Sequence, residues 1–281
     1  MNQGVVWPAP AKLNLMLHIT GRRTDGYHDL QTVFQFLDLC DELQFKVTTN
    51  KAITRRQGPS FIAAKDDLVV RSARELQRIS GTFRGVEIRI NKHIPVGAGL
   101  GGGSSDAATT LHALNRLWGL NLERDTLAGL GLQLGADVPV FIHGQAAWGE
   151  GVGEILTPVT LPQAWYLVVI PAISVSTADI FSDAELTRDT PRMTIRDFLS
   201  GGGQNDCEAV VRRRYPEVSA ALDWLSGFSP ARMTGTGGCV FAAFGSEAEA
   251  RSVERVLPPV WSCLVARGLN RSPLLTAAPD R

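Results

Sequence analysis

The residues Pro95–Ala108 read PVGAGLGGGSSDAA, and three of the five glycines in this stretch are consecutive. Segment 85–92, GVEIRINK, precedes the stretch and alternates apolar with polar residues, as a half-buried strand does. Apolar residues at helical spacing follow it and predict a helix over Ser105–Trp118 that ends at Gly119. A flexible linker between domains would lack such an anchored helix, so the linker interpretation is weak.

Two further interpretations of these glycines remain open. Gly97, Gly99 and Gly102 spell the G-x-G-x-x-G of a dinucleotide-binding turn. That motif needs an acidic residue at the end of a second strand about 20 residues further on, whereas GLNLERD, near residue 120, follows a predicted helix. The other alternative is a tight turn without a ligand, for which a glycine or two would suffice.

A phosphate cradle fits the stretch best. Glycines let successive backbone N–H groups converge on an anion, and the N-terminus of the following helix adds unpaired N–H donors. Ser104 and Ser105 add hydroxyl groups, and we expect them to cap that helix. The cradle is not a Walker loop, because no G-K-[ST] closes it.

Charge and cysteine content limit the possible functions. Lys plus Arg equals Asp plus Glu, at 28 each, so an anion must be held by local geometry, and we expect no nucleic-acid or membrane partner. The four cysteines form no C-x-x-C pair, which predicts free thiols and no zinc or redox motif. The N-terminus lacks a signal-peptide pattern and the apolar runs are short, so a cytoplasmic protein is expected.

The order of predicted strands and helices indicates a mixed fold. Strands and helices occur without strict βαβ repetition, which predicts the α+β class. Two prolines in PVTLPQAW, near residues 158–164, predict a domain junction. We therefore expect one domain over residues 1–160 and a second over residues 161–281.

Two charged residues could carry phosphoryl transfer, which needs a base for the acceptor hydroxyl and a cation near the moving group. Asp137 lies in the apolar segment LGADVPVF, and Pro139 is expected to keep Val138 extended, so that Asp137 ends a helix as either a cap or a functional group. Lys12 shares a strand face with Asn14 in PAKLNLML. A lone strand lysine is usually solvated, whereas a Lys12–Asp137 pair would stabilise the developing alkoxide.

Three segments resemble the signatures of the GHMP small-molecule kinases: PAKLNLMLHI (10–19), the glycine stretch, and MTGTGGCVFAAF (233–244). Further segments resemble the branch of that family that acts on a cytidine diphosphate methylerythritol. They are RTDGYHDLQTVFQFLDLCDEL (23–43), LGADVPVFIHGQAAWGEGVGE (134–154) and NDCEAVV (205–211). The matching segments run from about residue 8 to residue 245 in the order of the family.

The resemblance implies a ribosomal-protein-S5-like N-terminal domain, a ferredoxin-like C-terminal domain and an active site in the cleft between them. It implies ATP-dependent phosphorylation of the substrate's 2-hydroxyl, in the non-mevalonate route to isoprenoid precursors, with Asp137 as base, Lys12 as its partner and Asn14 beside the reacting hydroxyl. The implied ATP phosphate loop is Pro95, Val96, Gly97, Ala98, Gly99, Leu100, Gly101, Gly102, Gly103, Ser104 and Ser105.

The resemblance also implies how the substrate's cytosine is bound. Tyr27 would stack on the base opposite Phe181, His28 would bind the base edge, and Thr177 would lie nearby. Mg²⁺ is expected with the triphosphate; no carboxylate ligand can be named from the sequence, and Ser105 is a candidate hydroxyl.

Other functions remain as rivals. Homoserine and mevalonate contain no base that could stack on an aromatic ring, so the DGYH segment argues against a GHMP kinase that acts on either of them. A catalytically inactive sensor would not need both Lys12 and Asp137, and a dinucleotide oxidoreductase would need the acidic residue noted above. The sequence leaves monomer and homodimer equally open.

Overall fold

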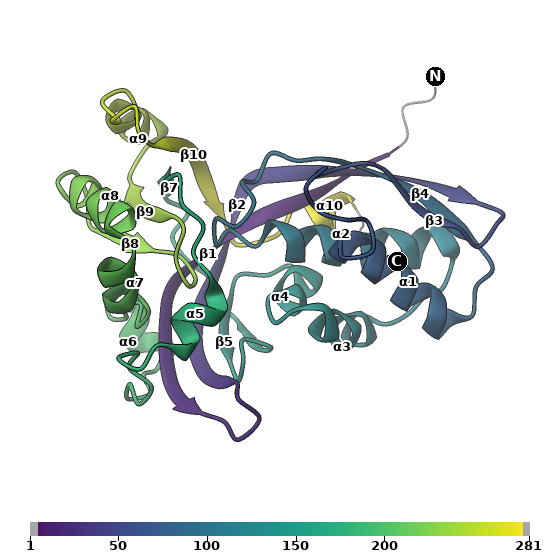
Figure 1. Ribbon diagram of the computed structural model, residues 1–281, viewed down its shortest axis with the longest axis horizontal. Coiled ribbons are helices and arrows are strands. Elements are labelled where there is room, and N and C mark those ends of the chain that lie inside the picture. The colour runs from purple at the N-terminus through teal and green to yellow at the C-terminus, as the bar shows by residue number, and fades with distance from the viewer. Residues whose placement is uncertain (1–4, 278–281) are drawn as a thin grey trace.

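The computed structural model describes residues 5–277, and Figure 1 shows the arrangement of its elements. The strands are β1 (Val6–Arg22), β2 (His28–Thr48), β3 (Ile53–Gln57), β4 (Gly85–Asn91), β5 (Ala147–Glu150), β6 (Ile155–Pro158), β7 (Trp165–Ile170), β8 (Ala231–Met233), β9 (Val240–Phe244) and β10 (Ser262–Leu269). The helices are α1 (Leu68–Ser80), α2 (Gly102–Trp118), α3 (Arg124–Leu134), α4 (Val138–His143), α5 (Thr177–Ser182), α6 (Ile195–Leu199), α7 (Glu208–Arg214), α8 (Pro216–Ser226), α9 (Glu247–Glu254) and α10 (Leu274–Ala277).

One continuous sheet joins the two halves of the described chain. Its strand order is β3-β4-β2-β10-β7-β9-β8, with β1 and β5 also paired to β2, and β6 paired to β5. The two halves meet where β10 pairs with β2, at Gly268 opposite Leu37 and Leu269 opposite Phe36. A Cβ atom on Gly268 would lie 2.8 Å from the Tyr166 ring, so this contact requires glycine.

Helices cover the sheet in two separate groups. Helices α1 and α2 pack against the N-terminal strands, and α3 and α4 pack on these two helices; α8 and α9 pack against the C-terminal strands, and α7 packs on α8, at the left of Figure 1. Leu274 of α10 belongs to the core of the N-terminal half, so the end of the described chain returns to that half. The mixed α+β class is therefore confirmed, while the boundary at residue 160 stays a prediction.

Strand β1 runs through the cores of both halves. Trp7 packs in the N-terminal core, Leu13 in the core between the halves, and Leu17 and Ile19 in the C-terminal core. Its other face, which carries Lys12, is buried as well. The polar residues near the middle of β1 therefore lie where the two halves meet.

Two local expectations from the sequence are wrong. Helix α2 begins at Gly102 instead of Ser105, because Gly101 adopts a left-handed conformation (φ 73°) and takes the N-cap position. Val138 is the first residue of α4 and is not extended, so Asp137 precedes a helix instead of ending one, as α3 already ends at Leu134. Proline fits the first turn of a helix because the N–H it lacks would have no helical partner there, so Pro139 is accommodated without moving Val138.

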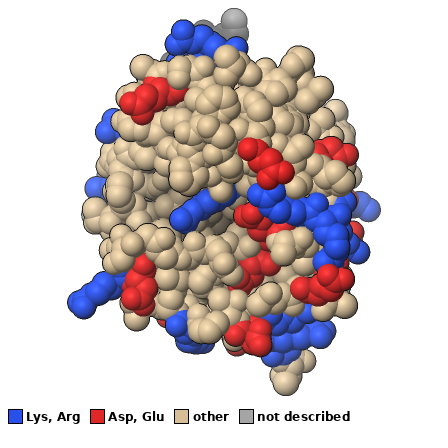
Figure 2. Space-filling model, turned by 90° about the vertical axis from the view of Figure 1, so that its left-hand side faces the viewer, with Lys and Arg blue, Asp and Glu red and all other residues tan. Residues whose placement is uncertain are grey.

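Charged side chains of both signs are interspersed on the face shown in Figure 2, which has no extended area of a single charge. Among the described helices, none combines the length and the apolar composition needed to cross a bilayer. All four cysteines are free, as expected.

Candidate active site

A cavity of about 690 Å³ lies at the junction of the two halves. It brings together residues from β1, the β1–β2 turn, the glycine loop, the turn before α4, and α5. Of the residues that the sequence analysis nominated, the cavity is lined by Lys12, Asn14, Tyr27, His28, Pro95, Val96, Gly97, Ala98, Gly99, Leu100, Gly101, Gly102, Gly103, Ser104, Asp137, Thr177 and Phe181. Ser105 is the exception: it is fully buried and does not line the cavity.

Lys12 and Asp137 form an ion pair in this cavity. Lys12 Nζ lies 3.1 Å from Asp137 Oδ2. Both residues line the cavity, and the lysine side chain is 3% exposed while that of Asp137 is 35% exposed, so the carboxylate is the more accessible of the two. Asp137 occupies the N-cap position of α4, but its side chain makes no cap hydrogen bond. The carboxylate is thus free to accept a proton from a bound hydroxyl.

Strand β1 and its neighbours fix the position of the Lys12 ammonium. Irregularities in the β1–β2 pairing flank the segment Lys12–Asn14, and such irregularities redirect side chains. Lys12 Nζ donates hydrogen bonds to Asn14 Oδ1 and to the carbonyl of Gly99. Asn14 Nδ2 in turn donates to Thr32 Oγ1, at 2.8 Å. Asn14 therefore orients Lys12.

The glycine loop alternates backbone freedom with anchored side chains. Gly97, Gly99 and Gly101 all have positive φ, at 76°, 75° and 73°, whereas the intervening Ala98 and Leu100 are buried in the core. Alternation of this kind turns successive N–H groups toward one concavity, which suits an anion. The first N–H groups of α2, beyond the loop, have no partner within the helix.

The serines after the glycines do not have the role expected of them. No side chain caps α2, so the expectation that Ser104 and Ser105 cap this helix is wrong. Ser104 still faces the cavity, whereas Ser105 Oγ is buried without a hydrogen-bond partner in the described residues. Because Gly101 is the N-cap, helix α2 starts earlier than expected, and Ser105 lies in the first turn of the helix.

A second glycine turn, between β8 and β9, closes against the loop. A Cβ atom on Gly99 would lie 3.0 Å from the carbonyl oxygens of Thr234 and Gly237, so the two turns touch through their backbones. Asn205, the first residue of the NDC segment, donates to the carbonyls of Met233 and Gly235 at 3.0 and 2.8 Å. The NDC segment therefore holds this second turn in place.

The far end of the cavity carries the aromatic residues. Tyr27 is 62% exposed and lies at the end of the β1–β2 turn, immediately before β2. The ring of His28 stacks on that of Phe181, with centroids 5.1 Å apart and planes 24° apart. Thr177 Oγ1 lies 2.8 Å from Thr236 Oγ1 and so ties α5 to the second glycine turn. Burial lowers the pKa of His28 first, and the charges of Arg188 and Arg22 lower it further.

Sequence reasoning missed a charged cluster behind the glycine loop. Lys92 lines the cavity and is bound by the carboxylates of Asp41 and Asp106, the second at 2.7 Å. Burial raises the pKa of Asp106 to about 8, while the Lys92 charge opposes the rise. An aspartate inside the apolar α2 pattern was the available signal, but its partners lie far away in the chain.

Another missed segment lies on the opposite side of the loop from α5. Pro59, Ile62 and Leu68 line the cavity, together with Ile90 of β4. In Figure 1, α5 lies to the left of α2, whereas α1 lies alongside α2 at the right. The cavity thus has an apolar region at each side of the phosphate loop. In the described part of the chain, no group of three His, Cys, Asp or Glu side chains is arranged to hold a metal.

Two family models match this chain. Residues 67–145 match the N-terminal domain of the GHMP kinases, and residues 189–262 match the GHMP kinase C-terminal domain. The first match contains the glycine loop and Asp137, and the second contains the second glycine turn.

Full-length relatives are similar to the chain throughout. It is 56% identical over 271 residues to the 4-diphosphocytidyl-2-C-methyl-D-erythritol kinase of Nitrosococcus oceani, covering 96% of this chain and 97% of that protein. Identity to the kinase of the same name from Shewanella loihica is 51%, with 97% and 96% covered. A crystal structure of 4-(cytidine 5'-diphospho)-2C-methyl-D-erythritol kinase matches with a TM-score of 0.83 at 31% identity, covering 94% of this chain and 98% of that one.

Proposed function

The chain belongs to the GHMP kinases, among the 4-diphosphocytidyl-2-C-methyl-D-erythritol kinases, and we propose that it transfers the terminal phosphoryl group of ATP to the 2-hydroxyl of that cytidine diphosphate ester. The products are the 2-phosphate and ADP, in the methylerythritol phosphate route to isoprenoid precursors. The observation that carries the proposal is the Lys12–Asp137 pair inside the cavity that the glycine loop lines.

Asp137 is proposed as the general base. Its accessible carboxylate accepts the proton of the 2-hydroxyl as the oxygen attacks the terminal phosphorus, while the bond from that phosphorus to the bridging oxygen of ADP breaks. The buried Lys12 ammonium stabilises the negative charge that develops on the attacking oxygen. The Gly99 carbonyl and Asn14 hold that ammonium in place before the substrate binds, so little reorganisation is needed during the reaction.

The phosphates of ATP are proposed to bind along residues 95–104. The left-handed glycines and the start of α2 supply N–H donors, so the site binds polyanions although the chain has no net charge. Ser104 lines this region, and its hydroxyl oxygen would suit a Mg²⁺ ion that is held mainly by the triphosphate. When bound, the ion neutralises phosphate charge. Ser105 does not line the cavity, so it is not proposed to bind the phosphates or Mg²⁺.

The two apolar regions of the cavity are proposed to hold the two bases. Tyr27, His28 and Phe181 bind the cytosine, with Thr177 beside them, and the region of Pro59 and Leu68 receives the adenine. We also propose that residues 1–160 form the ATP-binding domain and residues 161–281 the second domain, with the site between them, although α10 packs back on the first half.

The proposal is tested by ADP release with a panel of acceptors. We expect Mg²⁺-dependent ADP release with 4-diphosphocytidyl-2-C-methyl-D-erythritol, and phosphorus NMR of the product should show a phosphate monoester on the 2-oxygen. Homoserine and mevalonate should give only the background rate. ADP release with either of these acceptors, and none with the cytidine substrate, would favour another GHMP kinase and contradict the proposal.

A further inference from the structure

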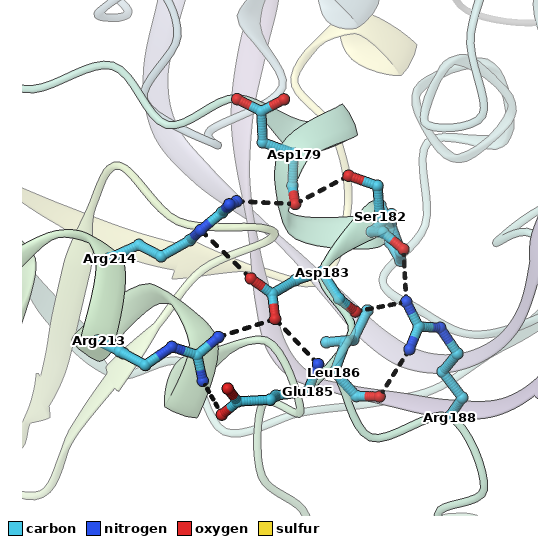
Figure 3. A network of polar contacts seen from close by, with 9 residues as sticks. Asp179, Ser182, Asp183, Glu185, Leu186, Arg188, Arg213 and Arg214 are labelled. Atoms are coloured by element: carbon cyan, nitrogen blue, oxygen red, sulfur yellow. Dashed lines mark hydrogen bonds and ion pairs between the residues drawn. The ribbon is translucent and has the colours of Figure 1, made fainter.

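The guanidinium of Arg188 joins His28 to the end of helix α5. Its Nη2 donates to the carbonyls of Phe181 and Asp183, at 2.9 and 2.7 Å, and its Nη1 donates to the carbonyl of Leu186 at 3.0 Å. Figure 3 shows this group of contacts. Arg188 Nε donates to His28 Nε2 at 3.1 Å. No carboxylate in the described residues pairs with Arg188. Its N–H groups donate instead to carbonyl groups and to one imidazole.

A second layer of charge holds the backbone to which Arg188 binds. The Asp183 carboxylate accepts from Arg213 and lies 3.2 Å from Arg214 Nε, and both arginines belong to α7 (Figure 3). Arg213 also binds Glu185. These ion pairs hold the backbone whose carbonyl groups bind Arg188. They therefore also hold the direction of the Arg188 Nε–H bond.

This contact determines which nitrogen of His28 carries the proton. An arginine Nε always bears hydrogen, so the His28 Nε2 that faces it must be the acceptor. Burial and the nearby charges of Arg188 and Arg22 lower the pKa of His28 and keep the ring neutral. A neutral imidazole with Nε2 as acceptor carries its proton on Nδ1. No residue in the range 5–277 is hydrogen-bonded to that Nδ1, and His28 lines the cavity.

We propose that Arg188 is a positioning residue that presents His28 as an Nδ1–H donor, and that this donor selects cytosine, whose ring nitrogen N3 accepts a hydrogen bond, over uracil, whose N3 carries hydrogen. The inference rests on the proposed function, because it assigns the specificity of the same base site. A site that donates to N3 leaves two hydrogens facing each other when uracil binds, and unpaired polar groups of this kind give strong discrimination.

The first test measures the tautomer directly. Proton–nitrogen NMR of the ¹⁵N-histidine-labelled protein without substrate should show His28 as Nδ1–H in the wild type. Arg188→Lys should keep this tautomer, because an ammonium only donates, whereas Arg188→Gln should lose the bias, because an amide can also accept. Arg212→Gln is the matched control, since Arg212 also belongs to α7 but pairs with Glu208 and Asp223, outside the network that holds Arg188. An Nε2–H tautomer in the wild type overturns the proposal without any variant.

The second test measures specificity as kcat/KM for the cytidine substrate divided by that for its uridine analogue. We expect this ratio to fall by about tenfold in Arg188→Gln, through KM for the cytidine substrate, with kcat and the KM for ATP unchanged. Arg188→Lys should recover most of the ratio, and Arg212→Gln should keep it. If Arg188→Gln keeps both the wild-type ratio and the wild-type tautomer, this inference is wrong while the proposed function stands. If the wild-type protein is inactive on the cytidine substrate, the proposed function itself is contradicted.

Discussion

Lys12 Nζ lies 3.1 Å from Asp137 Oδ2. The lysine is buried, although lysines on strands are usually exposed to solvent. A buried ammonium needs a fixed partner, and here it has a carboxylate, an amide oxygen and the Gly99 carbonyl. The pair therefore links the phosphate loop, through Gly99, to the base that the reaction needs.

Replacement of Lys12 by Met should lower kcat while leaving nucleotide binding nearly intact. Loss of one preorganised donor at a developing oxyanion costs about 10²- to 10³-fold in rate. Methionine is unbranched like lysine and one atom shorter, so it fits the same space and removes only the charged end that contacts Asp137. Steady-state kinetics and calorimetry with ATP measure the two effects separately. A variant with kcat within a factor of about three of the wild type would contradict the assigned role.

Gly101→Ala should disrupt the site more than a glycine substitution elsewhere. A Cβ atom there would lie 2.8 Å from Phe141 Cζ and 3.0 Å from Lys12 Cε, and φ is 73°. The left-handed conformation alone costs about 1–2 kcal/mol for an alanine. We expect lower stability in urea unfolding and a lower kcat. Gly129→Ala, in α3 with nothing within 4 Å, is the control and should keep activity; equal effects of the two substitutions would refute the close-packing argument.

Tyr27→Ala should raise the KM for the cytidine substrate and leave the KM for ATP unchanged. The exposed ring lines the cavity, and loss of one aromatic stack is worth about 0.5–1.5 kcal/mol, or roughly three- to tenfold. Initial rates at varied concentrations of each substrate measure both constants. An unchanged KM for the cytidine substrate would place the base elsewhere.

Asp106→Asn should stabilise the protein increasingly as the pH rises from about 5 to about 8. Burial raises the pKa of Asp106 from 3.8 to about 8, so between these values the native state binds more protons than the unfolded state, and stability falls as the pH rises. Asparagine removes this dependence, whose slope is at most about 1.4 kcal/mol per pH unit. Urea unfolding at pH 5 and pH 8 measures it, with the exposed Asp189→Asn as control. A stability difference that does not change with pH would show that Asp106 is ionised throughout this range.

Features encoded by local periodicity could be predicted from the sequence. Val86, Ile88 and Ile90 alternate in β4 and all three are buried, as their spacing indicates. The glycine loop could be located because strand and helix patterns flank it. The pairing of Lys12 with Asp137 is now seen as a contact, whereas from the residues alone it was only a possibility.

Features that depend on distant segments could not be predicted in this way. The partners of Asp106 and Arg188 come from other elements, and no period in the sequence connects Arg188 with His28. The two wrong expectations about where helices begin have a local origin instead. A left-handed Gly101 and a proline in the first turn of α4 began those helices at residues that side-chain preferences alone did not indicate.

The central claim, that Asp137 is the base of an ATP-dependent phosphoryl transfer to the 2-hydroxyl of the cytidine substrate, is tested most directly by single-turnover kinetics of Asp137→Asn. With enzyme in excess over labelled ATP, the account predicts that both substrates bind as in the wild type, while the rate of product formation falls by about 10²- to 10⁴-fold. Product formation at the wild-type rate by the fully bound variant would contradict it.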